Sequence, residues 1–171
     1  LGANTTGKYN DAFGYGALSA NTIGIENSAF GYYALRTNTT GSYNVAVGAS
    51  ALRANTSGGY NVAVGRQSLR NNTFGYSNVA VGYASLYGNT TGNYNSGFGY
   101  RTLFANTTGS YNVAVGGWAL TSNVIGVNNT AVGYQSLINS TSGCYNTSLG
   151  YNALCSNTTG NENTAKIGRA H

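Results

Sequence analysis

The sequence predicts an all-β protein, a parallel β-solenoid or β-roll of about ten coils with 17 residues in each. Three observations support this prediction: a gapless internal repeat, glycine and asparagine at fixed repeat positions, and a scarcity of helix-forming residues. The stretch NTTGSYNVAVG occurs twice, at Asn38–Gly48 and Asn106–Gly116, and the two copies start 68 residues apart, which is four repeats of 17.

The whole chain, residues 1–171, divides into a single domain of such repeats. We number the positions of each repeat from 1 to 17. Gly at position 4 and Asn at position 7 occur in all ten repeats, and Leu at position 15 occurs in all nine complete ones. The last repeat is irregular: in NTAKIG, Gly168 follows Asn163 by five residues, whereas in earlier repeats the corresponding Gly follows Asn by four. The repeats begin at Asn4, Asn21, Asn38, Asn55, Asn72, Asn89, Asn106, Asn123, Ser140 and Asn157.

The composition favours strands and turns over helices. Charged residues make up 6% of the chain, against about 25% in an ordinary soluble domain. There are 26 Gly, 15 Tyr and no Pro, while Glu, Lys and Gln are scarce. Helical repeats are longer and need those helix formers, so a repeat of 17 residues fits one coil of a solenoid whose neighbours stack at ~4.8 Å.

Alternation along a strand sorts the residues of each coil into two faces. Positions 7, 9 and 11 hold small, nearly invariant residues such as Asn44, Ala46 and Gly48, and we expect them to point inward. Stacked Asn side chains at position 7 would bond coil to coil. Gly at positions 4 and 11 would supply positive φ at the corners.

The other face carries an apolar stripe along the solenoid. Either the two faces are assigned the wrong way round, or another chain covers the stripe, because a long exposed apolar strip marks an interface. The core of one thin coil is small, so we predict association with copies of the same chain, as a trimer or as an end-to-end or lateral filament. The candidate interface residues are Val45, Val47, Val62, Val64, Val79, Val81, Val113 and Val115.

Two stretches, YNVAVG and NNTAVGYQSL, resemble the N-x-A-[IV]-G repeats in the heads of YadA-type trimeric autotransporter adhesins. The fuller pattern NTTGxxNTAxGxxAL is similar to repeats of phage tail fibres and bacterial surface fibre proteins. The resemblance covers essentially the whole chain and implies a left-handed β-roll in a trimeric, extracellular, adhesive or structural fibre. The matching residues are Asn44, Ala46, Val47 and Gly48, and Asn112, Ala114, Val115 and Gly116.

Titratable residues are too few for an active site. The acids are Asp11, Glu26 and Glu162, and the one histidine is His171. We therefore predict no catalytic residues, no metal site, no cofactor and no enzymatic activity. The net charge of +5 is spread thinly, which does not indicate a nucleic-acid partner. No apolar run approaches the ~18 residues of a membrane span.

The predicted function is that of a structural or adhesive segment of an extracellular fibre or filament, on a cell surface, in a secreted filament or on a virion. The alternative is an ice-binding or glycan-binding solenoid. For ice, the candidate feature is a row of Thr at position 2. For glycans, Arg36, Arg53 and Arg70 share position 16 of consecutive repeats. Their stacked guanidinium groups repel one another, so they either point apart into solvent or bind an anionic glycan of a cell surface. Tyr recurs at positions 6 and 12, and such ladders stabilise sheets.

Two further patterns concern covalent modification. Cys144 and Cys155 lie in one repeat and could form a disulfide in an extracellular protein. Sequons for N-glycosylation follow from the turn composition at position 1. These sequons are at Asn4, Asn38, Asn55, Asn89, Asn106 and Asn157.

Overall fold

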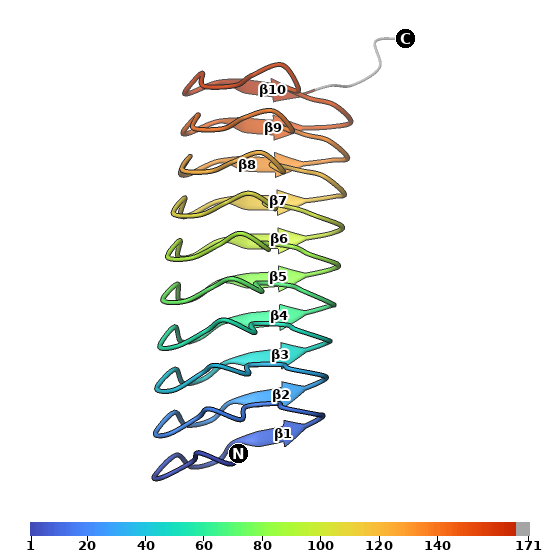
Figure 1. Ribbon diagram of the computed structural model, residues 1–171. Helices are drawn as coiled ribbons and strands as arrows, with labels where there is room; N and C mark the ends of the chain where they lie inside the picture. The colour runs from blue at the N-terminus through green and yellow to red at the C-terminus, as the bar shows by residue number, and fades with distance from the viewer. Residues whose placement is uncertain (167–171) are drawn as a thin grey trace.

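The computed structural model describes residues 1–166 as one stack of coils, each contributing a single three-residue strand (Figure 1). The strands form one parallel sheet in the order β1 to β10. Within residues 1–166 no helix is long and apolar enough to cross a membrane. The strands are β1 (Asp11–Phe13), β2 (Ser28–Phe30), β3 (Val45–Val47), β4 (Val62–Val64), β5 (Val79–Val81), β6 (Ser96–Phe98), β7 (Val113–Val115), β8 (Thr130–Val132), β9 (Thr147–Leu149) and β10 (Thr164–Lys166).

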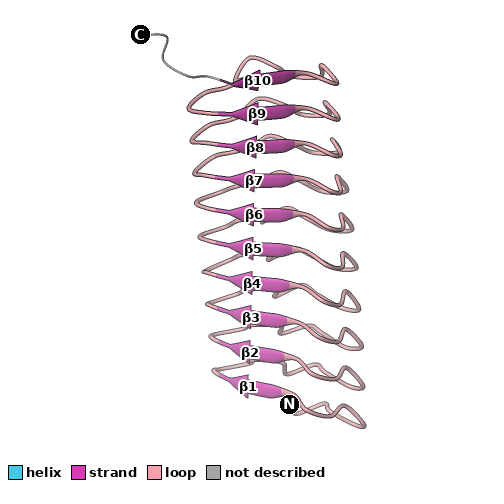
Figure 2. Cartoon of the chain, turned by 180° about the vertical axis from the view of Figure 1, so that it is seen from behind, coloured by secondary structure: helices cyan, strands magenta, loops and turns pink. Residues whose placement is uncertain are grey.

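Each strand pairs with the next one at an offset of one repeat. Ala46 in β3 lies beside Ala63 in β4, and Ala63 lies beside Ala80 in β5. The sheet forms one side of the solenoid (Figure 2), and the return segments, positions 12 to 17, run along the opposite side (Figure 1). The β-solenoid with a repeat of about 17 residues is therefore confirmed.

The last strand keeps the register of the others. Thr164 lies beside Thr147 and Lys166 beside Leu149. The irregularity predicted from the spacing of Asn163 and Gly168 comes after β10, and Gly168 lies outside the described residues.

The two faces are assigned correctly, because the small residues point inward. Ala46 and Asn44 are fully buried, whereas Val45 and Val47 on the same strand are exposed. Leu at position 15 packs against the inner face of the sheet and is fully buried in the first eight repeats, from Leu18 to Leu137. Alternation within β3 therefore accounts for both the core and the outer stripe.

The predicted asparagine ladder at position 7 is present. Asn61 donates from its side chain to Asn44 Oδ1 at 3.1 Å and to the Gly75 carbonyl at 2.9 Å, and its backbone N–H also donates to Asn44 Oδ1. A second ladder, which the sequence analysis missed, runs through position 1: Asn55 Nδ2 donates to Asn38 Oδ1 at 2.7 Å. The buried side-chain NH2 groups of both ladders thus donate across coils. The ladder at position 1 ends at Asn123, whose Oδ1 has no partner among the described residues because Ser140 replaces asparagine in the next coil.

Glycine recurs at two repeat positions, 4 and 11, for different structural reasons. Gly48 at position 11 has φ +129°, in agreement with the expected left-handed corner. Gly41 at position 4 does not have a positive φ, so the expectation for that position is wrong. A Cβ on Gly41 would collide with Asn38 Oδ1 and the Gly58 carbonyl oxygen. Glycine is therefore required at position 4 by the close approach of the asparagine ladder and the next coil.

Positive φ occurs instead at three positions that carry side chains, 6, 13 and 15. In the fourth coil these are Tyr60 at 58°, Gln67 at 62° and Leu69 at 47°. A non-glycine residue in this region costs on the order of 1–2 kcal/mol. The cost is offset because each of the three donates its backbone N–H to a neighbouring coil at 3.0 Å.

Candidate interaction surfaces

The valine stripe lies on the outer face of the sheet, as the sequence analysis proposed. Its exposed fraction ranges from 36% to 39% at five of the eight predicted residues, and the other three are half-buried. Larger apolar residues extend the stripe along position 10, including Phe30 and Phe98. The five exposed valines are Val45, Val47, Val64, Val113 and Val115.

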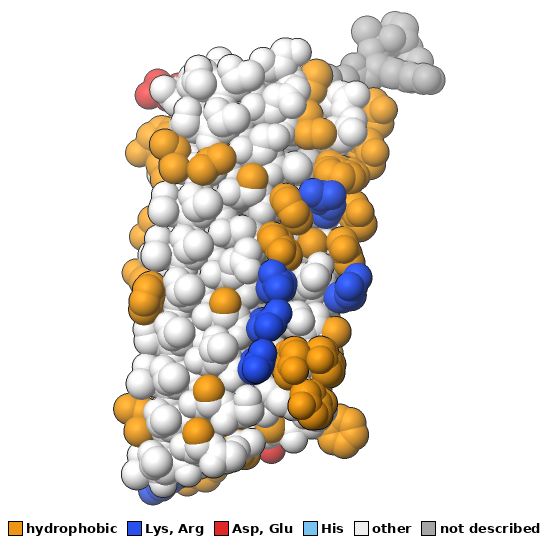
Figure 3. Space-filling view, in the orientation of Figure 1, with side chains coloured by type: hydrophobic (Ala, Val, Ile, Leu, Met, Phe, Trp, Pro, Cys, Tyr) orange, Lys and Arg blue, Asp and Glu red, His pale blue; other side chains and the backbone are white. Residues whose placement is uncertain are grey.

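The three predicted arginines occupy position 16 of consecutive coils, in the return segments opposite the sheet, where Figure 3 shows a row of basic side chains. Arg36 lies over the ring of Tyr33, with 4.3 Å from its guanidinium carbon to the ring centroid, and Arg53 lies 5.4 Å from the same ring. Arg70 lies 5.5 Å from the ring of Tyr87 and donates from Nη1 to its hydroxyl at 2.8 Å. A hollow of about 240 Å³ opens beside Arg53 and Arg70.

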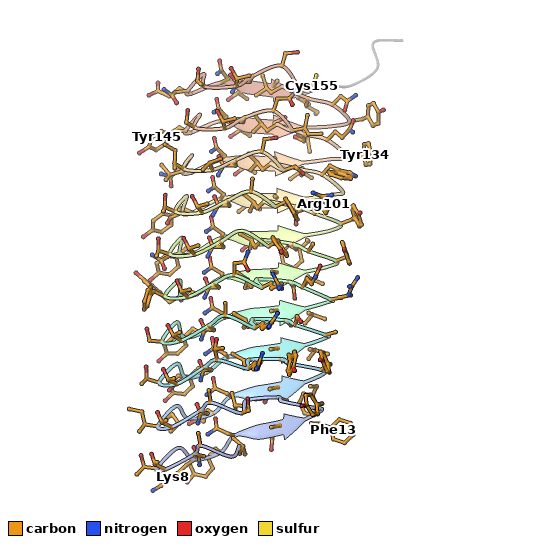
Figure 4. The ribbon with its side chains drawn as sticks, in the orientation of Figure 1. Lys8, Phe13, Arg101, Tyr134, Tyr145 and Cys155 are labelled. Carbon is orange, nitrogen blue, oxygen red and sulfur yellow. The ribbon has the colours of Figure 1, made fainter. Side chains whose placement is uncertain are left out.

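Aromatic rings extend the arginine row and pack against it. Tyr87 and Phe104 occupy position 16 of the next two coils and stack with 5.0 Å between ring centroids. Arg101 lies over the ring of Phe104 at 3.9 Å, on the side of the solenoid shown in Figure 4. A hydrogen bond with Tyr32 and the nearby guanidinium groups lower the pKa of Tyr33, because they stabilise its phenolate. The row therefore combines positive charge with ordered rings.

The hydroxyl groups in the row of threonines at position 2 bond within the protein. Thr39 Oγ1 donates to the carbonyl of Thr56 at 3.1 Å, and Thr56 Oγ1 donates to the carbonyl of Thr73 at 3.0 Å. The carbonyl of Thr56 also accepts the backbone N–H groups of Thr39, Thr40 and Gly41. These threonines close a turn, which reduces their capacity to order surface water.

The tyrosine ladders are discontinuous and consist of stacked pairs. At position 6, Tyr43 stacks on Tyr60 with 4.7 Å between ring centroids. At position 12, Tyr83 stacks on Tyr100 at 5.3 Å. Such stacked aromatic pairs contribute to stability between neighbouring coils.

Four of the six predicted glycosylation sites are inaccessible in the folded chain. Asn38, Asn55, Asn89 and Asn106 are fully buried, and their side-chain amides belong to the ladder at position 1. A glycan on any of them would break that ladder, so the fold disfavours the possible modification at these four sites. At the two ends of the stack, Asn4 is exposed and Asn157 is half-buried.

The predicted disulfide is not formed. Cys144 and Cys155 are both free and half-buried. The thiol of Cys144 lies 3.4 Å from the carbonyl of Ser142, whereas that of Cys155 lies 3.9 Å from the hydroxyl of Ser156. Sharing a repeat therefore does not pair the two thiols, and each one contacts a residue close to it in the sequence.

The carboxylates do not form a cluster. Glu26 and Glu162 occupy position 6 of the second and tenth coils, eight coils or roughly 38 Å apart. Residues 1–166 contain no group of three or more His, Cys, Asp and Glu side chains that could hold a metal ion.

One edge of the solenoid has a period of three coils that the sequence analysis missed. Position 3 is apolar only in every third coil, at Ile23, Phe74 and Ile125, and these side chains are 52%, 61% and 55% exposed. Position 5 is apolar in the same coils. The signal was present in the sequence as a spacing of 51 residues, or three repeats. A hollow of about 380 Å³, lined in part by Tyr43 and Tyr60, lies on this edge between the coils of Ile23 and Phe74.

Comparison with known proteins does not extend these observations. No family model matches the chain, and neither a curated protein nor a solved structure is significantly similar to it.

Proposed function

We propose that this chain is a structural segment of an extracellular fibre or filament, and that it associates with further copies of itself through the valine stripe. The observation that carries the proposal is an uninterrupted stack of coils with one apolar stripe along its sheet. Such a stack is extended and stiff, because neighbouring coils are joined by backbone bonds and side-chain ladders at every repeat.

The exposure of the stripe supports association. Val45 and Val47 point away from the core, so another residue of the same coil cannot cover them. They repeat in register from β3 to β5, which produces a continuous apolar strip. A strip of this kind marks an interaction site, and a second copy with the same coil spacing would match it along its length.

The resemblance of the Asn-x-Ala-Val-Gly sets to adhesin and tail-fibre repeats supports an extracellular location. The composition is consistent with this, since a chain with 6% charged residues and abundant Gly, Asn and Thr suits a rigid fibre. The scattered carboxylates favour a role without catalysis.

Sedimentation velocity and electron microscopy of the purified chain test the proposal. We expect oligomers or filaments for the native sequence. The variant Val47→Thr/Val64→Thr/Val115→Thr should shift the chain to a monomer, because threonine keeps the β-branched shape while adding a polar group to each exposed side chain.

The matched control removes three exposed apolar side chains from the edge with the three-coil period. We expect Ile23→Thr/Phe74→Thr/Ile125→Thr to associate like the native chain. If this variant dissociated and the valine variant did not, the interface would lie on that edge rather than on the valine stripe. A native chain that stays monomeric at high concentration would refute self-association altogether.

An ice-binding solenoid is the alternative function. The row at position 2 favours it only weakly, since Thr39 and Thr56 donate their hydroxyls to carbonyls of the next coil. Position 3 mixes Thr, Ser, Ile and Phe, so a second regular row is absent. An ice-recrystallisation assay separates the two functions: inhibition by the purified chain would favour ice binding.

A further inference from the structure

The arginine row on the side opposite the sheet is the most concentrated charge in the described part of the chain. We propose that Arg36, Arg53 and Arg70, with the hollow beside them, form a binding site for an anionic polysaccharide that carries sulfate or carboxylate groups. This inference deepens the adhesive part of the proposed function, and its failure would leave coil stacking and self-association untouched.

No carboxylate shares a coil with Arg53 or Arg70, and the one in the coil of Arg36 is Glu26, ten positions away along the repeat. The chain contains no Asp or Glu between Glu26 and Glu162, a span that includes every coil from the third to the ninth. Stacked coils are ~4.8 Å apart, so neighbouring guanidinium groups of the row repel one another. An anion bound along the row would relieve this repulsion.

Aromatic contacts hold the guanidinium groups in place. Arg36 and Arg53 share the ring of Tyr33, at 4.3 Å and 5.4 Å from its centroid. Arg70 is fixed by the ring and the hydroxyl of Tyr87. Cation–π contacts are favourable by themselves, and here they keep the three side chains from moving apart into solvent. A site ordered in advance loses little entropy when its ligand binds.

The hollow gives the site a shape that an acidic sugar can enter. Its volume is about 240 Å³, and it is lined by Arg53, Arg70, Thr37, Ala54 and Asn71. Guanidinium groups bind sulfate and carboxylate through paired, charge-assisted hydrogen bonds. The Thr37 hydroxyl donates to the carbonyl of Arg53 at 2.8 Å, so its oxygen can still accept from a sugar hydroxyl, and the amide of Asn71 can bond to a second one. The lining therefore suits both the charge and the hydroxyl groups of an acidic sugar.

The aromatic rings of the row favour a polysaccharide over a nucleic acid. Single-stranded nucleic acids bind through bases that stack on free aromatic faces. The ring of Tyr87 already packs against Arg70 and Phe104, and the ring of Phe104 packs against Tyr87 and Arg101. Little ring surface remains for a base, which leaves the anionic groups as the feature that the site recognises.

Isothermal titration of the full chain with three probes at low salt tests the inference. The probes are heparin as a sulfated polysaccharide, polygalacturonate as a carboxylated one, and single-stranded DNA of similar charge. We expect heparin, polygalacturonate or both to bind more tightly than DNA, and the stronger of the two identifies the preferred anion. Binding should weaken as salt rises, because counterions are released on binding.

Two variants that lose equal charge separate a site from a general charge effect. Arg53→Gln/Arg70→Gln should lower polysaccharide affinity by about ten-fold or more and reduce the salt dependence. Lys8→Gln/Lys166→Gln removes two charges elsewhere and should change the affinity less than about two-fold. Thermal unfolding of both variants verifies that the solenoid is intact.

Three results would overturn the inference: no polysaccharide binding by the native chain, an equal loss of affinity in both variants, or tighter binding of DNA. None of them would alter the sedimentation behaviour on which the fibre proposal depends.

Discussion

Replacing Asn95 by alanine would interrupt the asparagine ladder at position 7 in the middle of the stack. The Asn95 side chain is fully buried. Its Nδ2 donates to Asn78 Oδ1 at 3.1 Å and to the Gly109 carbonyl at 2.8 Å. Its Oδ1 accepts the backbone N–H and the side-chain amide of Asn112, both at 3.1 Å. The substitution therefore removes four hydrogen bonds.

These four bonds are not equivalent. Asn78 Oδ1 keeps the backbone N–H of Asn95, the Gly109 carbonyl keeps a side-chain donor from position 1, and Asn112 Nδ2 keeps the carbonyl of Gly126. The three bonds to these groups contribute about 1 kcal/mol each. The backbone N–H of Asn112 loses the acceptor it has in the ladder and stays buried, at a cost of about 2 kcal/mol. We therefore expect the free energy of unfolding to fall by about 5 kcal/mol.

Urea denaturation followed by circular dichroism measures this change. The control is Asn139→Ala, since Asn139 is exposed and donates one bond, to the carbonyl of Cys155. We expect the control to lose less than about 1 kcal/mol. If Asn95→Ala lost no more stability than Asn139→Ala, the ladder would not be a major source of stability and the reasoning would be wrong.

Three further predictions concern the core, the glycines and the thiols. Leu103→Ala should lower the free energy of unfolding by about 2–5 kcal/mol, whereas Leu149→Ala, at a side chain that is 44% exposed, should change it by less than about 1 kcal/mol in the same urea titration. Gly92→Ala should prevent folding or cost about 3 kcal/mol or more, because its Cβ would collide with the backbone of the next coil. Gly117→Ala is the control, since the nearest atom is a ring carbon of Tyr134 at 3.4 Å, and we expect its urea midpoint to stay unchanged or to rise slightly. Both cysteines should react with a thiol reagent without prior reduction, and the presence of a disulfide in the folded chain would contradict this.

The repeat allowed most of the fold to be predicted. A constant spacing of 17 residues fixes which residues stack, and alternation along the strand fixes which of them point inward. The conformation of Leu69 could not be predicted, because a left-handed leucine contradicts local preference and is stabilised by core packing and by a bond to the next coil. The prediction of a positive φ at Gly41 was wrong for the same reason. Glycine is required there because of contacts with Asn38 and the following coil, which the local sequence does not reveal.

How well each candidate site could be predicted depended on whether the repeat position alone determines it. The arginine row was predicted because a shared repeat position is sufficient to align side chains. Its packing on Tyr33 and Tyr87 was not predicted, because it depends on side-chain rotamers in neighbouring coils. The sequon at Asn55 was misleading, because three residues define the motif while the whole stack determines burial.

The division of the coil into fixed and variable positions explains where binding sites can arise in this fold. Positions 1, 4, 7, 11 and 15 are constrained by ladders, close approach and core packing, so chemical variety is confined to outward positions. Position 16 runs through Ser19, Arg36, Arg53, Arg70 and Tyr87 in the first five coils without any change in the register of the sheet. Because a substitution there leaves the stacking bonds in place, the chemistry of this surface can change coil by coil while the backbone stays the same. The arginine row and the apolar edge with its three-coil period are two patterns of this type, and both follow from the same separation of scaffold from surface.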